Sequence, residues 1–288
     1  MRGELSPEHN ARGNGRLRLK GAVAIVTGAS GGIGAVTARA FAHRGTNVVL
    51  ADLTSQLPAL QTLAREVEAT GVQALVMPTD VTKREDIDRL VEATMERFHR
   101  IDVLANVAGI GASPSICDTT DEELERVVSV NLLGCARLMH AVLPIMKAQR
   151  RGSIINIGSI AGEVGIMGIY SGSKFGLRGL TDSVRREVRS LNIGVTLIEP
   201  GFVRTKMNPS MHVLPGPEIV ADAIVAAAVR PRRRIIVPKM YHFPAFIVNR
   251  FAGFADLVFG DARIQERINR DARAERAERE RTKAAIHG

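Results

Sequence analysis

The sequence contains no tryptophan and few aromatic residues of any kind, since Phe and Tyr make up 4% of its 288 residues. Hydrophobic residues reach 45%, so one sizeable core must be built mainly from aliphatic side chains. The two cysteines, Cys117 and Cys135, are too few for a disulfide framework and lack the spacing of metal ligands. They favour a reducing, cytoplasmic environment and predict no metal site.

Long hydrophobic runs are also absent. No stretch of about 18 uncharged apolar residues occurs, which argues against a membrane-spanning helix. Residues 1–19 lack the apolar centre of a signal peptide and indicate a flexible, basic leader. The net charge is +9, but the arginines concentrate at Arg230–Arg234 and in the C-terminal tail, without aromatic stacking partners. We therefore expect no nucleic-acid partner.

Seven short aliphatic runs recur along the middle of the chain, at 22–28, 47–53, 73–80, 101–109, 152–159, 194–201 and 234–238. Apolar runs without polar alternation are typical of strands covered on both faces. Segments with helical spacing separate them, as at Ile87, Leu90 and Thr94. The pattern predicts an α/β fold with a single doubly wound, Rossmann-type domain over 20–240, a seven-stranded parallel sheet, and a helical C-terminal extension over 241–288.

Two capping patterns predict where helices begin. Thr82 with Glu85, and Thr120 with Glu123, have the spacing of a capping box, in which a hydroxyl and an acid satisfy the first free amides of a helix.

A glycine-rich segment, "TGASGGIG", follows the first predicted strand. Gly28, Gly32 and Gly34 allow a sharp turn and close approach of a ligand, and the helix behind them offers free N–H groups to a pyrophosphate. Asp52 closes the second predicted strand. An acid there can accept hydrogen bonds from the adenosine ribose and repels a 2′-phosphate, which predicts NAD rather than NADP as the cofactor.

The segment "YSGSK" places Tyr170 and Lys174 four residues apart. On a helix these positions share a face, so the ammonium would favour the phenolate form of the tyrosine. Such a pair can exchange a proton with a substrate near neutral pH. Hydride transfer from an alcohol carbon requires this chemistry, because a proton must also leave the oxygen.

Five motifs in order, "TGASGGIG", "NVAG", "GSIAG", "YSGSK" and "PGFVRT", resemble the short-chain dehydrogenase/reductase family over roughly residues 20–240. The resemblance implies that Tyr170 is the general acid/base and that Lys174 activates it and holds the nicotinamide ribose. It also implies that Ser159 polarises the substrate oxygen and that Asn131 holds a water of a proton relay.

The same resemblance implies a cofactor site. Within it, Asp80 would contact the adenine, Asn106 to Gly109 would wall the cofactor, and Pro200, Gly201 and Thr205 would border the nicotinamide. The full set of expected cofactor-binding residues is Gly28, Ser30, Gly32, Ile33, Gly34, Asp52, Asp80, Val81, Asn106, Ala108, Gly109, Tyr170, Lys174, Pro200, Gly201, Val203 and Thr205.

Three features of the sequence depart from the family pattern. Val107 replaces a frequent asparagine in "NVAG", and Gly158 replaces a common serine before Ser159. The loop from Ser159 to Tyr170 is also shorter than usual, which puts the path of that loop over the substrate in question.

The loops expected around the substrate are largely apolar, which favours a lipophilic secondary alcohol or ketone, such as a steroid-, retinoid- or fatty-chain-like compound. The residues concerned are Ile160, Val164, Ile166, Met167, Met207, Met211, Val213 and Leu214. An NAD-dependent oxidoreductase is therefore the favoured function. The alternative is a nucleotide-sensing regulator on the same fold, which would be expected to have lost Tyr170 or Lys174.

Family resemblance further implies a homodimer or homotetramer packed through long helices near 120–148 and 170–190. The Phe-rich segment 243–259 has apolar residues at three- and four-residue steps and predicts one apolar helix face. That face either packs on the domain or across a subunit interface, or it covers the substrate entrance. In the second case, residues 241–260 would rest peripherally on a membrane, helped by Arg232–Arg234.

Overall fold

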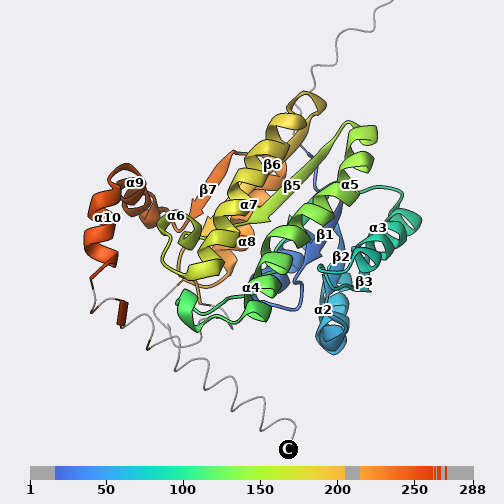
Figure 1. Cartoon of the computed structure of the whole chain (residues 1–288). Helices are drawn as coiled ribbons and strands as arrows, with labels where there is room; N and C mark the ends of the chain where they lie inside the picture. Colours follow the sequence, from blue (N-terminus) through green and yellow to red (C-terminus); the bar gives the residue numbers. More distant parts are fainter. Residues whose placement is uncertain (1–16, 205–214, 262, 264, 267–269, 271–288) are drawn as a thin grey trace, which may run out of the picture.

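The computed structural model describes residues 17–204, 215–261, 263, 265, 266 and 270, and shows a parallel sheet between two layers of helices (Figure 1). The sheet has the order β3-β2-β1-β4-β5-β6-β7, with every neighbouring pair parallel. Its strands are β1 Val23–Thr27, β2 Asn47–Asp52, β3 Ala74–Pro78, β4 Val103–Asn106, β5 Gly152–Ile157, β6 Ile193–Pro200 and β7 Arg234–Val237. The predicted seven-stranded, doubly wound sheet is confirmed.

The strand order reverses next to β1. The chain passes from β1 outward to β2 and β3, then returns to β4 on the other side of β1, and continues outward from there. In a doubly wound sheet, ligands bind outside the carboxyl ends of the strands at such a reversal. The site is therefore expected beyond Thr27 and Asn106, the last residues of β1 and β4.

Helices cover both faces of the sheet. Three pack on one face: α1 Gly32–Ala42, α2 Leu57–Glu68 and α8 Glu218–Val229. Three more pack on the other: α3 Arg84–Phe98, α5 Cys135–Gln149 and α7 Gly168–Glu187.

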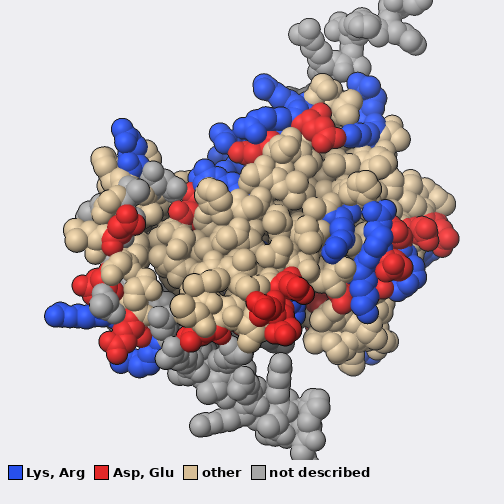
Figure 2. All heavy atoms as spheres, in the orientation of Figure 1, with Lys and Arg blue, Asp and Glu red and all other residues tan. Residues whose placement is uncertain are grey.

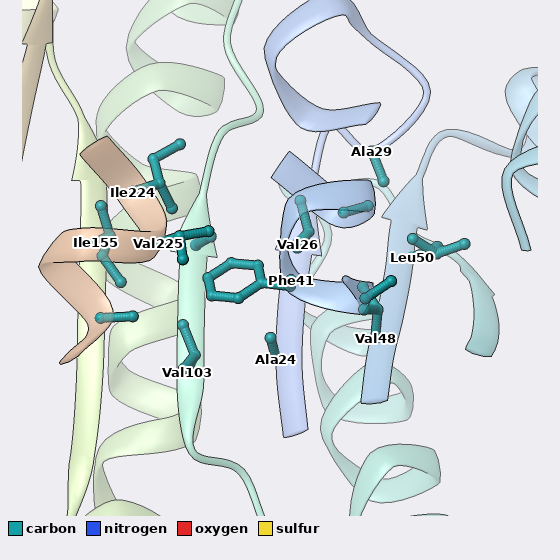
Figure 3. Close-up of a cluster of buried hydrophobic side chains, with 14 of the residues drawn as sticks. Ala24, Val26, Ala29, Phe41, Val48, Leu50, Val103, Ile155, Ile224 and Val225 are labelled. Atoms are coloured by element: carbon teal, nitrogen blue, oxygen red, sulfur yellow. The ribbon is translucent and has the colours of Figure 1, made fainter. Parts of the chain in front are cut away.

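The core between α1, α8 and the sheet is aliphatic except for Phe41. Figure 3 shows the Phe41 ring lying over the sheet between Val103 and the side chains of β1 and β2. The Phe41 side chain is fully buried, which stabilises the fold by roughly 1.5–3 kcal/mol. Leu17 and Leu19, which the sequence placed in the leader, are also buried in this cluster.

Of the two predicted capping boxes, the hydroxyl half of one is confirmed and the other is wrong. The hydroxyl of Thr120 accepts a hydrogen bond from the Glu123 amide at 3.3 Å, at the start of α4 Asp121–Val128. The Thr82 hydroxyl instead donates to Asp80 at 2.7 Å, and α3 begins after Lys83 without a side-chain cap. A nearer acceptor thus displaces the capping interaction.

Helix α4 continues through a π-helical turn, Ser129–Gly134, into α5. Within the described residues, Asp121–Gln149 is the one helix long and apolar enough to cross a membrane, with a mean hydropathy of 1.5. Leu138, Val142 and Met146 on α5 are buried against the sheet, so this apolar composition belongs to a core helix.

The Phe-rich segment does not form the single helix that its spacing predicts. The chain breaks at Phe251, with φ −130° and ψ 73°, between α9 His242–Arg250 and α10 Ala252–Phe259. One continuous apolar face is therefore wrong for this segment. Phe243 and Phe246 are 72% and 60% exposed, while the tail 271–288 lies outside the described residues.

Membrane contact by this segment stays a prediction, and its electrostatic support is weaker than expected. Two of the three arginines invoked for it are engaged within the protein: Arg233 pairs with Asp182 at 2.6 Å, and Arg234 pairs with Glu163 at 2.7 Å.

Candidate active site

The glycine-rich loop after β1 has no room for side chains at two positions. Gly28 has a φ of +65°, and a Cβ there would lie 2.9 Å from the Ala108 backbone. A Cβ on Gly34 would lie 2.0 Å from the Gly28 carbonyl oxygen. Helix α1 starts directly behind this turn at Gly32, and no side chain caps it. Its first N–H groups, including that of Ile33, therefore face the end of β1 as potential donors.

Thr27, which the sequence did not single out, holds this loop against the next one. Its hydroxyl oxygen accepts hydrogen bonds from the Val107 and Ala108 amides at 3.1 and 3.2 Å. The walls of the crevice formed by β1 and β4 are thereby tied together. A threonine at the end of an otherwise apolar strand was the available signal.

The Asp52 carboxylate lies at the end of β2 beside the glycine-rich loop. Its Oδ2 accepts from the Ser30 amide at 3.0 Å and from the Ser30 hydroxyl at 2.6 Å, and its Oδ1 accepts from the Leu53 amide at 2.8 Å. Three hydrogen bonds fix the position of this negative charge.

Asp80 and Val81 follow β3. The Asp80 Oδ1 accepts from the Thr82 amide and hydroxyl at 2.9 and 2.7 Å, which shapes the turn into α3. Val81 packs against the π-helical turn, where a Cβ on Gly134 would lie 2.9 Å from its Cγ2. Both residues thus border the same edge of the sheet.

A row of buried polar side chains joins β4, β5 and α7. Asn106 donates to Asn156 at 2.8 Å, and Asn156 donates to Thr181 at 2.9 Å. Among the described residues, Asn106 Oδ1 finds no hydrogen-bond partner. Asn156 was missed from the sequence, although an asparagine inside the apolar run "SIINI" was a visible signal.

Tyr170 and Lys174 lie one helical turn apart on α7, as predicted. The Lys174 side chain is buried, and its Nζ donates to the Ile157 carbonyl at 2.8 Å. The same Nζ lies 5.8 Å from the centre of the Tyr170 ring. The ammonium is therefore fixed between the end of β5 and the phenol.

Asn131 lies in the π-helical turn and is fully buried. Its side chain exchanges two hydrogen bonds of 2.9 Å with the backbone of Ile110 and donates to Ser173 at 3.2 Å. Gly109 lies next to both the Asn131 and the Lys174 side chains, because a Cβ there would lie 3.3 Å from Asn131 Oδ1 and 3.4 Å from Lys174 Nζ. π-Helical turns occur frequently at functional sites.

Ser159 follows β5, and its Oγ accepts from the Ala161 amide at 3.1 Å. The next residue, Ile160, donates its amide to the Pro200 carbonyl at 2.9 Å, and Gly201 donates to Val237 at 2.7 Å. Backbone bonds thus join the serine loop to the ends of β6 and β7.

The segment after β6 is partly described. A Cβ on Gly201 would lie 2.3 Å from the Tyr241 ring, and Val203 is buried in the core. Thr205 and the predicted pocket residues Met207, Met211, Val213 and Leu214 lie outside the described residues. Asn131, Tyr170 and Lys174 lie on helical segments, and the other predicted catalytic and cofactor-binding residues lie at the carboxyl ends of strands or in the segments that follow them.

Comparison with known proteins agrees with this arrangement. The short chain dehydrogenase family profile matches residues 22–212. A 3-oxoacyl-[acyl-carrier-protein] reductase of Thermotoga maritima is 36% identical over 199 residues, covering 68% of this chain and 79% of that protein. This chain belongs to the short-chain dehydrogenase family. It is an oxidoreductase by that membership, acting on alcohol or ketone groups.

Two further relatives extend the comparison. An uncharacterized oxidoreductase of Bacillus subtilis is 32% identical and covers 94% of this short-chain dehydrogenase and 79% of its own length. A solved short chain dehydrogenase/reductase of Burkholderia phymatum, in complex with NAD, superposes with a TM-score of 0.76 at 25% identity, covering 83% of this chain and 96% of that one.

A thiol lies behind the site of this short-chain dehydrogenase. Cys135 is buried, and burial raises its pKa to about 11, with the Lys174 charge opposing that rise. The thiol therefore stays neutral and packs as an apolar group. Within the described ranges, no cluster of three or more His, Cys, Asp or Glu side chains is placed to hold a metal ion.

Proposed function

We propose that this short-chain dehydrogenase transfers hydride between NAD(H) and a secondary alcohol or ketone, with Tyr170 as general acid/base. The observation that carries the proposal is the fixed ammonium of Lys174, 5.8 Å from the Tyr170 ring and hydrogen-bonded to Ile157. A positive charge in that place favours the phenolate that must form when the tyrosine gives up its proton.

The residues present fit a nicotinamide dinucleotide. The uncapped N-terminus of α1 can receive the pyrophosphate on N–H groups of Gly32, Ile33 and Gly34. The Asp52 carboxylate would accept hydrogen bonds from the adenosine ribose hydroxyls, and the Lys174 ammonium would donate hydrogen bonds to the nicotinamide ribose. The Burkholderia phymatum relative, whose structure holds NAD, supports the choice of cofactor.

When bound, the nicotinamide supplies the hydride donor or acceptor. For reduction of a ketone, the Tyr170 hydroxyl gives its proton to the substrate oxygen, and in alcohol oxidation the phenolate takes a proton from it. Ser159 Oγ accepts from Ala161, which leaves its own O–H as a donor to that same oxygen.

The proposed role of Asn131 is adjusted by its contacts. Its side chain is committed to Ile110 and Ser173, so the water of a proton relay would be held by its main-chain carbonyl. The π-helical turn supports this placement, because it departs there from the regular α-helical hydrogen-bond pattern.

The substrate we propose is lipophilic. Ile160, Val164, Ile166 and Met167 follow Ser159 and are only half-buried, so apolar surface remains beside the serine. An apolar wall with few polar groups suits a steroid-, retinoid- or fatty-chain-like ketone or alcohol. No contact favours the regulator alternative, since Tyr170 and Lys174 are both present and placed together.

The function is tested by following NADH absorbance with a panel of steroid, retinoid and aliphatic ketones and alcohols. Turnover of at least one lipophilic compound is expected, with sugar alcohols and hydroxy acids much poorer. Binding of NADH without turnover of any compound would instead support the regulator.

The cofactor preference has its own test at Asp52. We expect NAD to exceed NADP in kcat/KM, and Asp52→Ala to reduce the preference about tenfold, which corresponds to about 1.4 kcal/mol of repulsion removed from a 2′-phosphate. The measurement is kcat/KM for both cofactors.

Asp52→Asn is the matched control, because the amide oxygen still accepts from Ser30 while the charge is lost. The asparagine should shift the preference as far as alanine does. Equal use of NAD and NADP by the unmodified enzyme would contradict the assignment.

Assembly is a further proposal. On the helices expected to pack between subunits, Val127 and Leu138 are buried within the single chain. The face between α5 and α7 is nevertheless largely uncharged in Figure 2, with acidic residues of α4 at its margin. Leu133 in the π-helical turn and Phe175 on α7 are 40% and 60% exposed. We therefore propose a homodimer or homotetramer packed through this face.

Light scattering at micromolar concentration should give a dimer or tetramer mass, and Phe175→Lys should lower it, because a lysine cannot be buried there without cost. A monomer mass for the unmodified protein would refute the proposal.

A further inference from the structure

Two buried acids and two partly exposed arginines form a charged cluster beside the site, which takes no part in the proton transfer described above. Its acids are Glu163, on α6 Ala161–Val164, and Glu199, on β6. Their side chains are 0% and 2% exposed. A buried carboxylate is costly unless it is paired, so the contacts of both acids indicate what they do.

Two arginines hold the acids. Arg234 on β7 contacts both, since its Nη2 lies 2.7 Å from Glu163 Oε2 and its Nε donates to Glu199 Oε2. Arg178 on α7 donates to Glu163 Oε1. Arg234 thus brings the two carboxyl groups to one guanidinium, so the charge of each acid acts on the other.

The protonation of the pair follows from its burial. Desolvation, together with the neighbouring charge of Glu163, raises the pKa of Glu199 to about 8, and Arg234 opposes that rise. Glu199 therefore carries a proton at neutral pH. The other charged groups on elements packed around the pair are paired elsewhere or exposed. Lys174 donates to Ile157, Asp182 pairs with Arg185 and Arg233, and Glu187 pairs with Lys147. The exposed ones are Arg186, Glu218, Asp222, His242 and Arg250.

The cluster touches the backbone on both sides of the catalytic serine. A Cβ on Gly158 would lie 3.1 Å from Glu199 Cγ, so the glutamate passes directly over the residue before Ser159. Gly162, one residue before Glu163, packs on α7, where its Cβ would lie 3.0 Å from Lys174 Cβ. Figure 1 shows α6 between α7 and α9, with β7 close by.

We propose that Glu163 and Glu199 are positioning residues, which hold Ser159 and Lys174 in register through their contacts with Arg178 and Arg234. Both targets act in the hydride transfer proposed above, on which this inference rests. Two departures from the family pattern coincide with the pair: Gly158 makes room for Glu199, and the shortened loop after Ser159 carries Glu163.

The consequence is a second pH dependence. When Glu199 loses its proton, two buried negative charges face each other and repel. The repulsion separates α6 from β6, and Ser159 between them loses its place. Turnover should therefore fall at alkaline pH for a reason that lies outside the catalytic tyrosine.

The test compares the unmodified enzyme with Glu199→Gln from about pH 6 to about pH 10. A glutamine can donate to Glu163 and accept from Arg234, but it has no proton to lose in this range. We expect the kcat ratio of variant to wild type to be near one at about pH 6.5 and to rise about fivefold by about pH 9.5. Taking a ratio cancels every pH dependence of kcat that the two enzymes share. A ratio that stays flat overturns the proposal.

A binding measurement separates this proposal from the proposed function. If the unmodified protein turns over no compound in the panel, the proposed function fails, and NADH titration still reports the placement of Lys174. Wild-type affinity for NADH should weaken relative to Glu199→Gln by about threefold over the same pH range. If the NADH affinities of the wild type and Glu199→Gln change with pH in the same way, the positioning role is overturned.

Melting temperatures report whether Glu199 holds a proton in the folded protein at neutral pH. The pKa of Glu199 is raised from its ordinary value of 4.5 to about 8 by folding. The folded state then binds more protons between these values, so wild-type stability falls relative to Glu199→Gln as pH rises from about 4.5 to about 8, and stays level above it. If the two melting temperatures depend on pH in the same way, Glu199 does not hold that proton, and the predicted pH dependence is contradicted.

Two further variants distinguish positioning from simple stabilisation. Glu187→Gln removes an exposed acid on α7, paired with Lys147 at 2.7 Å, and should leave kcat, NADH affinity and their pH profiles unchanged. Glu163→Gln weakens the contacts to Arg178 and Arg234 and should lower kcat about tenfold with substrate KM within about twofold. A Glu163→Gln enzyme that melts earlier but keeps its kcat would show a structural role only and overturn the proposal.

Discussion

Replacing Tyr170 by phenylalanine should lower kcat about 10³-fold and leave NAD affinity within about twofold of the wild-type value. The phenyl ring keeps its place 5.8 Å from the Lys174 ammonium, so packing is preserved. The hydroxyl that exchanges a proton with the substrate oxygen is lost. The measurements are NADH absorbance for turnover and calorimetry for cofactor binding.

Tyr241 provides the matched control, because it is the other of the two tyrosines in the chain. Its ring packs against Gly201 and meets Phe202 edge-on, with 6.4 Å between ring centres. Tyr241→Phe keeps these contacts and should retain turnover within about twofold. If Tyr170→Phe kept about a third of wild-type turnover, its assignment as acid/base would be wrong.

Replacing Lys174 by alanine should reduce both turnover and cofactor affinity, by about 10²-fold and about tenfold respectively. The ammonium is expected to act twice, since it favours the phenolate of Tyr170 and donates to the nicotinamide ribose. The lysine is buried, so the alanine also leaves a cavity and should lower the melting temperature.

Lys174→Met separates charge from packing, because methionine fills most of the volume without an ammonium. It should recover much of the melting temperature and none of the turnover. Loss of turnover with undiminished NAD affinity in both variants would argue against the ribose contact.

The sheet could be predicted from the sequence because of how parallel strands are buried. All five residues of β1 and all six of β5 are buried, so each strand is a mainly apolar run without regular polar alternation, which the sequence reveals. Helix ends depend on finer competition. Thr82 had the right spacing for a cap, but its hydroxyl found Asp80 within two residues.

The C-terminal helices show a different limit. The spacing of the apolar residues from Phe243 to Leu257 fits one helix face. Side-chain spacing alone does not reveal that the backbone turns at Phe251. Tertiary contact decides there, since α9 packs on α6 whereas α10 contacts mainly α9.

The candidate site divides in the same way. Residues that carry reactive or charged groups within recognisable motifs, such as Tyr170, Lys174 and Asp52, could be predicted from the sequence. Their supports could not, because a partner distant in sequence is invisible until the strands are paired. Asn106 and Asn156 meet through the register of β4 and β5, and Glu199 meets Glu163 only after β6 and α6 are in place.

The reversal of strand order beside β1 also governs how the chain must fold. Ala24 of β1 pairs with Val103 of β4, and two complete strand-and-helix units lie between them. Closing so long a loop costs more entropy than pairing near neighbours, and such non-local pairing is slow. During synthesis, β1 to β3 can assemble while one apolar edge of β1 waits for β4. The nascent chain therefore carries an open strand edge that is prone to aggregation, and the two sides of the cofactor crevice come together only after that edge is closed.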